Sequence, residues 1–352
     1  MGAIETLPRV QADAALTSIK EMVPLWGKIG AALYAALCTR IPEEPELVEI
    51  VSHGLASGSA NHLFVAVHFL LLGGDRNDPL ARYYATLTEK PAPPEEAFPD
   101  FVRFCKKHRE ELLHIIKTRT IQATTVERCK SIMPLLSHVA QLVGEPLNLI
   151  EVGCSAGVLL TFDRYAYEVK GYGLVGAKDA PLTFKIELRG GPKLHIPRIG
   201  TRIGLDLRPV DVRLEDERRW LLAQFFPEWR AGYAQLATAL DVVTRTDIDF
   251  FQGDALDLLP EFIAKSEGPL CIYHSACVMY WSTEAKVALN ALLLKASRDR
   301  EFYRVGIEPS DGQAATSLGS EISVAHYRDG TVDNRIVARL TTIDNSVMTW
   351  LE

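Results

Sequence analysis

The sequence predicts an α/β protein in which an N-terminal all-helical domain precedes a mostly parallel sheet with an antiparallel C-terminal edge. Three observations support this prediction. Apolar residues recur at helical spacing up to about residue 143, short apolar runs alternate with helical segments from residue 147 onward, and an Asp-Gly turn near the C-terminus separates two extended runs. We therefore expect two domains, residues 1–144 and residues 145–352.

The composition is that of a globular protein. The 352 residues are 47% hydrophobic and 24% charged, with a net charge of −7, and no run of Lys or Arg forms the basic stripe typical of nucleic-acid binding. The six cysteines show no CxxC spacing, no positively charged leader with an apolar core is present, and no His, Cys or carboxylate cluster has metal-ligand spacing. We expect a cytoplasmic protein without a metal, a nucleic-acid partner or membrane association.

The N-terminal domain is predicted from its helical periodicity. Apolar residues are spaced three or four apart through residues 101–116, and no convincing alternating segment occurs before residue 144. The apolar stretch at residues 63–72 contains His68 and is shorter than the roughly 20 residues that span a bilayer, so we expect a buried helix there. Residues 90–96 contain three prolines and should link two helices.

The C-terminal domain begins with a predicted strand at residues 147–152, which ends in a glycine loop and leads into a helical pattern at residues 158–167. Residues 182–188 then alternate strictly between apolar and polar side chains, and a Gly-Gly-Pro turn and a second extended piece follow them. We interpret residues 180–197 as a β-hairpin inserted in the fold.

The remaining strands are predicted from short apolar runs with helical segments between them, which is typical of a parallel sheet. These runs are residues 202–206, 248–252, 270–274 and 303–308. The C-terminal tail differs, because its extended runs flank the turn Arg328-Asp329-Gly330. The runs are residues 322–327, 335–342 and 346–351, and they predict the antiparallel edge of the sheet.

The glycine loop after the first strand, residues 151–157, carries the chemistry that the sequence indicates most clearly. Gly153 and Gly157 let the strand turn sharply and let a ligand approach backbone N–H groups, which suits a nucleotide-like ligand. Dinucleotide oxidoreductases need glycines where this chain has Ser155 and Val158, so a pyrophosphate would be crowded and NAD or FAD is disfavoured.

A carboxylate at the end of the next strand supports a ligand with a ribose. Asp206 ends an apolar run, and a carboxylate at the carboxyl edge of a sheet can accept hydrogen bonds from both ribose hydroxyls. It lies 206 − 157 = 49 positions beyond Gly157, whereas roughly 20 is usual, and the predicted hairpin accounts for most of the excess. Asp179 stands at nearly the usual distance and is the alternative ribose acid. A turn or helix cap before Pro209 would be the purely structural role of Asp206.

The pattern Glu151-x-Gly153-x-x-x-Gly157 resembles the glycine loop of class I methyltransferases that use S-adenosylmethionine (SAM). The resemblance implies a Rossmann-like sheet of seven strands and a SAM site in which Glu151 orders the methionine end of the cofactor. Gly153, Ser155 and Gly157 would then line the cofactor. It also implies that Asp254 and Ala255, which follow the strand at 248–252, contact adenine, although Asp254 is equally suited to cap the helix after it.

The end of the strand at residues 270–274 supplies the candidate catalytic residues. His274 is the natural general base, because an imidazole titrates near neutral pH and can take a proton from an attacking oxygen or nitrogen. Tyr273 and Tyr280 are supporting candidates. Methyl transfer to a small-molecule acceptor is therefore the leading hypothesis.

The same loop allows three other interpretations. Gly153-Cys154-Ser155-Ala156-Gly157 also matches the nucleophile elbow of α/β-hydrolases, with Asp254 as the acid and His274 or His326 as the base. Against this, the hydrolase elbow follows several strands, whereas the preceding residues are predicted to be helical. The chain could instead bind SAM or its product without chemistry, or the loop could serve only strand-to-helix packing.

The whole chain resembles a bacterial family of unknown function that is methyltransferase-like. Its motifs are residues 66–72, 79–84, 119–129, 151–167, 204–212 and 253–255. Before the glycine loop that family tends to read Gln-Thr-Asn-Glu-Val, whereas residues 122–126 here lack the Asn and the Glu. We expect a helix over residues 119–129 to cover the SAM pocket and select the substrate through Arg119, Gln122 and Arg128, although solvent exposure would also explain these polar residues.

Overall fold

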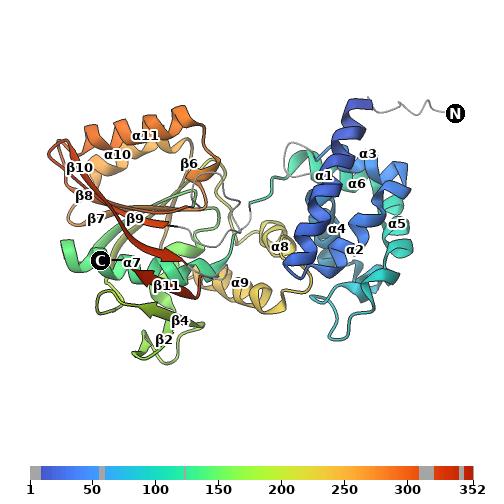
Figure 1. Cartoon of the computed structure of the whole chain (residues 1–352), viewed down its shortest axis with the longest axis horizontal. Helices are drawn as coiled ribbons and strands as arrows, with labels where there is room; N and C mark the ends of the chain where they lie inside the picture. The colour runs from blue at the N-terminus through green and yellow to red at the C-terminus, as the bar shows by residue number, and fades with distance from the viewer. Residues whose placement is uncertain (1–8, 55–59, 123, 309–320, 341–344, 352) are drawn as a thin grey trace. The chain divides into compact units, whose positions relative to one another are not determined.

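The structure is a computed structural model that describes residues 9–54, 60–122, 124–308, 321–340 and 345–351 (Figure 1). The chain forms two compact units. The first comprises Met1–Ala123 and Leu214–Ala234, and the second comprises Thr124–Arg213 and Gln235–Glu352. This division differs from the sequence-based one at residue 144, because residues 124–143 belong to the sheet-containing unit and residues 214–234 return to the helical unit.

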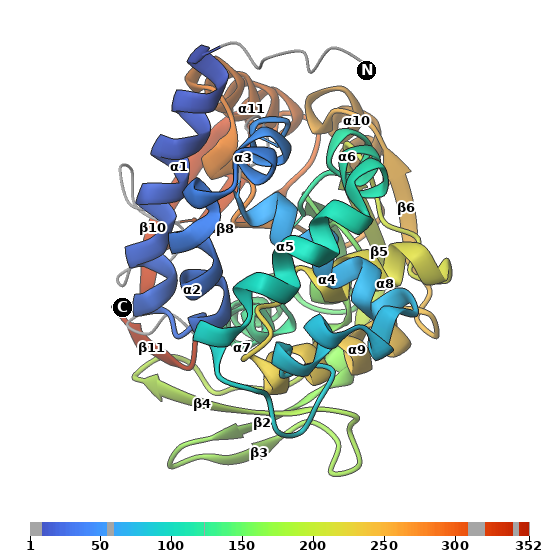
Figure 2. The ribbon, with the colours of Figure 1, turned by 90° about the vertical axis from the view of Figure 1, so that its right-hand side faces the viewer.

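The first unit is helical among its described residues, as its periodicity predicts (Figure 2). Its α-helices are α1 (Arg9–Lys28), α2 (Ala32–Arg40), α3 (Pro45–Ser52), α4 (Ala60–Gly73), α5 (Phe98–Lys107), α6 (Arg109–Thr118) and α8 (Glu215–Ala223), with short 3-10 turns between several of them. Helix α4 contains the apolar stretch at 63–72, and its side chains are buried from Leu63 to Leu71, so the predicted buried helix is confirmed.

Long-range hydrogen bonds explain why residues 214–234 belong to the first unit. The buried ring of His68 contacts the carbonyl oxygen of Ala223 through Nδ1 at 3.0 Å and the hydroxyl of Thr86 through Nε2 at 2.8 Å. Trp220 donates its indole N–H to the carbonyl oxygen of Thr120 at 2.9 Å. Burial lowers the pKa of His68 to about 4, so the ring is neutral and can donate from one nitrogen and accept at the other.

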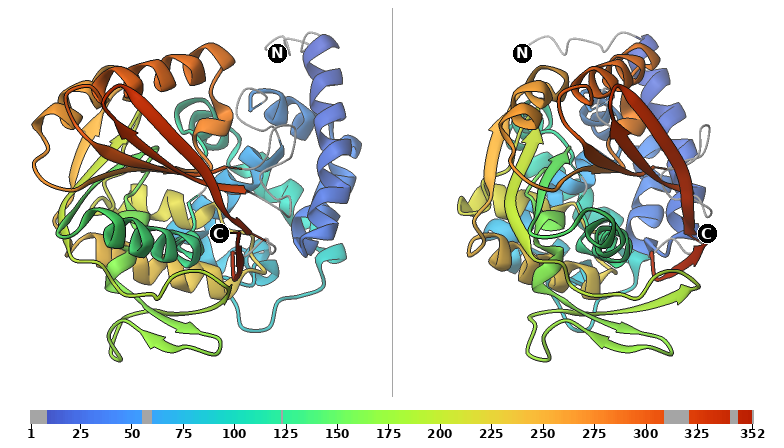
Figure 3. Two further views of the ribbon diagram at one scale, coloured as in Figure 1. Left: turned by 60° about the vertical axis from the view of Figure 1, so that its left-hand side comes forward. Right: turned by 90° about the vertical axis from the view of Figure 1, so that its left-hand side faces the viewer.

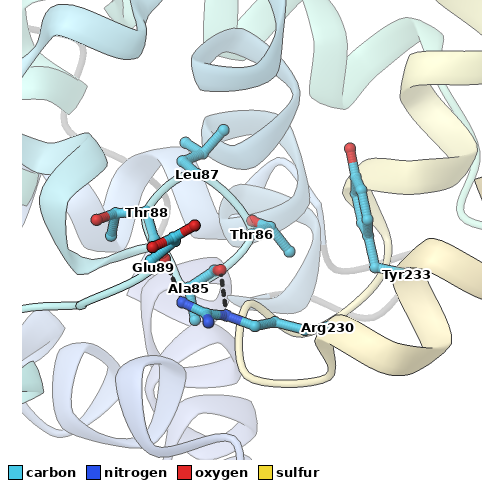
Figure 4. A pocket seen from close by; sticks show the side chains of 7 residues that line it. All are labelled: Ala85, Thr86, Leu87, Thr88, Glu89, Arg230 and Tyr233. Carbon is cyan, nitrogen blue, oxygen red and sulfur yellow. Dashed lines mark hydrogen bonds between the residues drawn. The ribbon is translucent and has the colours of Figure 1, made fainter.

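Arg230 fastens the segment after α4 in the same way. Its Nε donates to the carbonyl oxygen of Ala85 at 2.6 Å, and its terminal nitrogen donates to that of Thr88 (Figure 4). Arg230, Tyr233 and residues 85–89 line an open cavity of about 320 Å³ in this unit. Because the Arg230 guanidinium donates its hydrogen bonds to backbone carbonyl oxygens, we assign it a structural role.

The second unit is built on one sheet of eleven strands in the order β3-β2-β4-β11-β10-β9-β8-β7-β1-β5-β6. The strands are β1 (Leu147–Val152), β2 (Ala166–Val169), β3 (Gly173–Val175), β4 (Thr183–Arg189), β5 (Ile199–Asp206), β6 (Asp249–Gln252), β7 (Leu270–Ser275), β8 (Phe302–Ile307), β9 (Glu321–Arg328), β10 (Thr331–Leu340) and β11 (Val347–Trp350). The protein is therefore a mixed α/β protein, and most neighbouring strands in the sheet are parallel.

Five neighbouring strands, β6-β5-β1-β7-β8, are all parallel and begin and end within three residues of their predicted bounds. In chain order this is 3-2-1-4-5, so the direction of winding reverses between β1 and β7. Helices α10 (Ala255–Lys265) and α11 (Thr283–Ala296) share a core with one face of these strands, and α7 (Cys129–Val143) lies on the other face (Figure 3).

The antiparallel pairing of the C-terminal strands is confirmed, but the expectation that they form an edge of the sheet is wrong, because β4 pairs with β11 and continues the sheet beyond it. Strand β9 pairs with β8, β10 with β9, and β11 with β10, all in antiparallel register. Asp329 and Gly330 have φ angles of +53° and +72°, which a two-residue hairpin turn requires at both positions.

The predicted hairpin insertion at residues 180–197 is wrong. Its first half forms β4, which lies between β2 and β11 and runs parallel to both. The sheet has eleven strands, whereas the resemblance to methyltransferases implies seven. The second half forms no strand, because backbone N–H groups in and next to it donate to side chains in and near α7. The His195 N–H donates to Ser137 Oγ at 3.0 Å, and the Arg198 N–H donates to the carboxylate of Glu145 at 3.1 Å.

The helix predicted at residues 158–167 is also wrong. A single 3-10 segment, η7 (Val158–Arg164), follows the glycine loop and leads directly into β2. Arg202 of β5 holds this segment, since its Nε donates to the carbonyl oxygen of Leu160 at 3.0 Å and its guanidinium pairs with Asp163 at 2.7 Å. Both side chains are almost buried, with 7% and 10% of their surface exposed, so this ion pair fixes the path of the chain.

Candidate functional site

The glycine loop follows β1 at the point where the strand order reverses, which is where open α/β sheets bind their ligands. Gly153, Ser155 and Gly157 have φ angles of +77°, +49° and +72°. A Cβ atom on Gly153 would collide with the thiol of Cys277, and one on Gly157 would lie 2.8 Å from the ring of Phe250. Both positions therefore require glycine, because neighbouring side chains fill the space that a Cβ atom would need.

Asp206 connects this loop to the end of β5. One carboxylate oxygen accepts from the N–H of Ser155 at 2.8 Å, and the other accepts from the N–H of Arg208 at 2.9 Å. Asp179 is exposed between β3 and β4, and at least five strands separate these two strands from β1 in the strand order. The structure thus places Asp206, and not Asp179, at the glycine loop.

The end of β6 lies against the end of β5, because the Gly253 N–H donates to the carbonyl oxygen of Asp206 at 2.9 Å. Asp254 accepts from the N–H of Leu256 at 2.8 Å and caps α10, whose first residue is Ala255. The capping role foreseen for Asp254 is confirmed. Asp254 and Ala255 therefore reach the same edge as Asp206, as parallel strands require.

Glu151, the last but one residue of β1, is buried at this edge with Tyr273 of β7. The Tyr273 hydroxyl donates to the Glu151 carboxylate at 3.2 Å. Burial raises the pKa of Glu151 to about 8, while the positive charge of Arg128 and the bond from Tyr273 act against this shift. Arg128 donates to the carbonyl oxygen of Ser275, the last residue of β7, at 2.7 Å. Arg128 is therefore the only one of the three predicted substrate contacts that lies in the second unit.

Two buried hydroxyl groups at this edge have no hydrogen-bond partner among the described residues. They are Ser155 Oγ in the glycine loop and Ser275 Oγ at the end of β7, and Ser275 is only 4% exposed. Buried polar atoms are nearly always paired in folded proteins, so two orphans beside one loop indicate a polar group that a ligand would supply.

His274 does not have the free nitrogen that a general base needs. Its Nε2 lies 3.0 Å from Nε and 2.9 Å from a terminal nitrogen of Arg304, which can only donate, and its Nδ1 lies 2.6 Å from the carboxylate of Glu308. The proton is therefore on Nδ1 and points to Glu308. Burial lowers the pKa of His274, and Arg304 acts in the same direction, whereas the bond to Glu308 opposes them. Tyr280 lies in the 3-10 turn η8 (Val278–Tyr280) and is 73% exposed.

Arg119 and Gln122 lie in the first unit, where other residues engage them. Arg119 pairs with Glu217 at 3.2 Å, and its guanidinium lies over the rings of Phe69 and Trp220. The Gln122 N–H donates to the side chain of Gln224 at 2.9 Å. The helix expected over residues 119–129 is wrong, because α6 ends at Thr118 and only a 3-10 turn at 126–128 precedes α7.

Sequence reasoning missed Glu308, which accepts three backbone hydrogen bonds in addition to the bond from His274. The N–H groups of Cys277 and Val278 donate to one oxygen at 3.2 and 3.1 Å, and that of Met279 donates to the other at 3.2 Å. Burial alone would raise the pKa of Glu308, but these donors together hold it below its ordinary value. An acidic residue directly after the fifth parallel strand is the same signal that singled out Asp206, and it could have been found in that way.

A smaller cavity of about 230 Å³ lies next to the loop, where the Val210 N–H donates to the carbonyl oxygen of Ser155. Residues 209–213, the end of α9 (Arg230–Val243) and β6 line it. Asp211 contributes a carboxylate to the lining of this cavity, but the carboxylate is paired with Arg213. The cavity therefore presents mainly apolar surface.

No helix in the described ranges is long and apolar enough to cross a membrane. Within those same ranges, no group of three or more His, Cys, Asp or Glu side chains could hold a metal ion.

Comparison with known proteins identifies a family for the chain. Residues 27–343 match a family described as uncharacterized protein conserved in bacteria (DUF2332). The match covers most of the chain, so the chain belongs to this family, and the resemblance to a bacterial family of unknown function is confirmed. No curated protein matches the sequence.

Proposed function

For this member of a bacterial family of uncharacterized proteins, we propose a SAM-dependent methyltransferase with a Rossmann-like sheet that acts on a small-molecule acceptor. The observation that carries the proposal is the glycine loop at the reversal of strand order, tied to the carboxylate of Asp206 by the Ser155 N–H. A ligand bound there lies between a backbone that requires glycine and an acidic strand end, which suits a ribose.

Two features favour SAM over a ligand with phosphates. Phosphate binding uses the positive end of an α-helix, but only the seven-residue 3-10 segment η7 follows this loop. Carboxyl groups of Glu151, Asp206, Asp254 and Glu308 also gather at this edge, with Arg128 as a cation. A ligand with a sulfonium and an ammonium group is better matched to these acids than a pyrophosphate.

The residues present fit this cofactor. Asp206 would accept from the ribose hydroxyls, and the unpaired hydroxyls of Ser155 and Ser275 offer further polar contacts. Arg128 would offset the carboxylate of the methionine end, and the carboxyl group of Glu151 would accept a hydrogen bond from the ammonium group. Bound SAM supplies an electrophilic methyl group, so the chain has to orient the acceptor and exclude water. Because both nitrogens of His274 are engaged, we propose an acceptor that needs no strong base from this residue.

The proposal is tested by titration calorimetry of the full chain with SAM, S-adenosylhomocysteine and NAD. We expect binding of the first two, and Asp206→Ala should weaken it by about 1–3 kcal/mol, since a charged acceptor is lost. Asp211→Ala is the matched control, because this carboxylate pairs with the exposed Arg213 and should not matter. Equal affinity of wild type and Asp206→Ala, or a loss in Asp179→Ala instead, would contradict the assignment.

A hydrolase that uses Ser155 is the second candidate, favoured by the positive φ of this residue and its unpartnered hydroxyl. Its required base is not in place, since His274 contacts Glu308 and Arg304, and His326 contacts Glu301 before β8. Labelling of Ser155 by a fluorophosphonate would establish the hydrolase. Binding of SAM without turnover of any acceptor would instead favour a non-catalytic sensor.

A further inference from the structure

The segment after β7, residues 276–279, leads into the 3-10 turn η8, and a carboxylate from the next strand end accepts its backbone hydrogen bonds. Ala276 has a φ angle of +50°, which an alanine adopts only at a cost in energy. Three successive N–H groups, those of residues 277–279, converge on the single carboxylate of Glu308. We name residues 276–279 the Glu308-bound loop.

This loop packs directly against the glycine loop. Cys277 packs so closely on Gly153 that a methyl group in place of the Gly153 hydrogen would overlap its sulfur atom. The two loops follow β1 and β7, the strands between which the winding reverses. A shift of Cys277 would therefore change the space that is open to a ligand.

The Glu308 carboxylate is itself held by a chain of hydrogen bonds that begins at α11. Asn290 of α11 accepts from Arg304 at 2.8 Å, Arg304 donates to Nε2 of His274, and Nδ1 of His274 contacts Glu308 at 2.6 Å. Because Arg304 occupies Nε2, the histidine can only donate to Glu308. His274 thus orients the carboxylate instead of serving as a base.

We propose that Glu308, oriented by Arg304 and His274, is the positioning residue that holds the Glu308-bound loop against Gly153 and so shapes the ligand site. The shape of the loop follows from these contacts alone. Its importance for a cofactor rests on the proposed function.

Cys277 reports on the loop directly. It is the one cysteine of the chain that is not buried, and its partial burial raises the pKa of the thiol to about 12, so in the ordered loop it reacts slowly. Release of the loop exposes the thiol, lowers its pKa toward the ordinary value and speeds alkylation.

The experiment measures the rate at which iodoacetamide modifies Cys277 in the full chain, with the site identified by peptide mass spectrometry. In Glu308→Gln the amide nitrogen faces N–H donors, and we expect alkylation at least about tenfold faster, as the loss of a charged acceptor predicts. Glu301→Gln is the matched control, because Glu301 pairs with His326 before the same strand, β8, and should leave the rate unchanged.

Arg304→Lys is a milder second variant, which keeps the charge but cannot donate from two nitrogens of a guanidinium. Alkylation should be faster than in wild type but slower than in Glu308→Gln. If Glu308→Gln does not fold, Arg304→Lys tests the inference in its place. Wild-type rates in both folded variants would overturn the inference.

Calorimetry with SAM separates the two proposals. If wild type does not bind SAM, the proposed function fails while the alkylation result stands, and if it binds, Glu308→Gln should bind at least about tenfold more weakly.

Discussion

At the scale of single residues, the edge of the sheet contains a carboxyl group that the fold holds in its neutral form. Glu151 is 2% exposed and lies among strands, so its pKa of about 8 means that it binds a proton more tightly in the folded protein than in the unfolded chain. Folding stability contributed by this proton is complete below pH 4.5 and is lost as the pH rises toward 8.

Glu151→Gln should remove this dependence, because glutamine does not ionise. We expect the variant to unfold like wild type at pH 5 and to be more stable at pH 9, by a difference on the order of 3 kcal/mol, since one pKa unit corresponds to about 1.36 kcal/mol. Urea unfolding at both pH values measures it. Glu168→Gln, at an exposed site of β2, is the control and should show the same small effect at both. A Glu151→Gln effect that is equal at pH 5 and pH 9 would disprove the assigned burial penalty.

At the scale of elements, the short segment η7 is held by tertiary contacts and not by helix propensity. Its ion pair between Asp163 and Arg202 is almost completely buried, and removing one partner leaves the other charge without compensation. Asp163→Ala should therefore destabilise the protein by about 3–5 kcal/mol in urea unfolding.

The double variant Asp163→Ala with Arg202→Met should recover a large part of this loss, because no uncompensated charge then remains in the interior. Asp211→Ala breaks an exposed pair with Arg213 and should cost less than about 1 kcal/mol. If Asp163→Ala costs no more than Asp211→Ala, the ion pair does not determine the path of η7.

At the scale of the whole molecule, the compact units are not consecutive segments of the chain. Residues 214–234 belong to the helical unit, and α7 belongs to the unit that contains the sheet, where most of its side chains are buried. A truncated chain should therefore behave differently according to which of these elements it retains.

We expect residues 124–352 to keep a folded sheet and to be cleaved by protease within residues 214–234, because this segment then lacks the core that buries Trp220. Residues 144–352 lack α7 as well and should not fold, because α7 covers one face of the sheet. Circular dichroism melting and limited proteolysis measure both outcomes. Equal melting of the two fragments would show that α7 is not part of the folding unit.

Local sequence determined much of this fold. The parallel strands, the Asp-Gly hairpin, the buried helix α4 and the acidic strand end at Asp206 follow from spacing and turn chemistry within a few residues, and all are present. The glycine loop also follows from sequence, since positive φ angles and close packing select glycine at positions 153 and 157.

Only the tertiary structure decided the rest. The alternating pattern of β4 predicts a strand but does not name its partners, which are β2 and β11 and not a returning hairpin. Histidine is a residue type that often acts as a general base, but both ring nitrogens of His274 are hydrogen-bonded to Arg304 and Glu308, about thirty residues away in the chain. The physical reason is the same in each case. Periodicity shows which face of an element is buried. The neighbour of a strand and the hydrogen-bond partner of each polar atom depend on groups that meet only when the chain has folded.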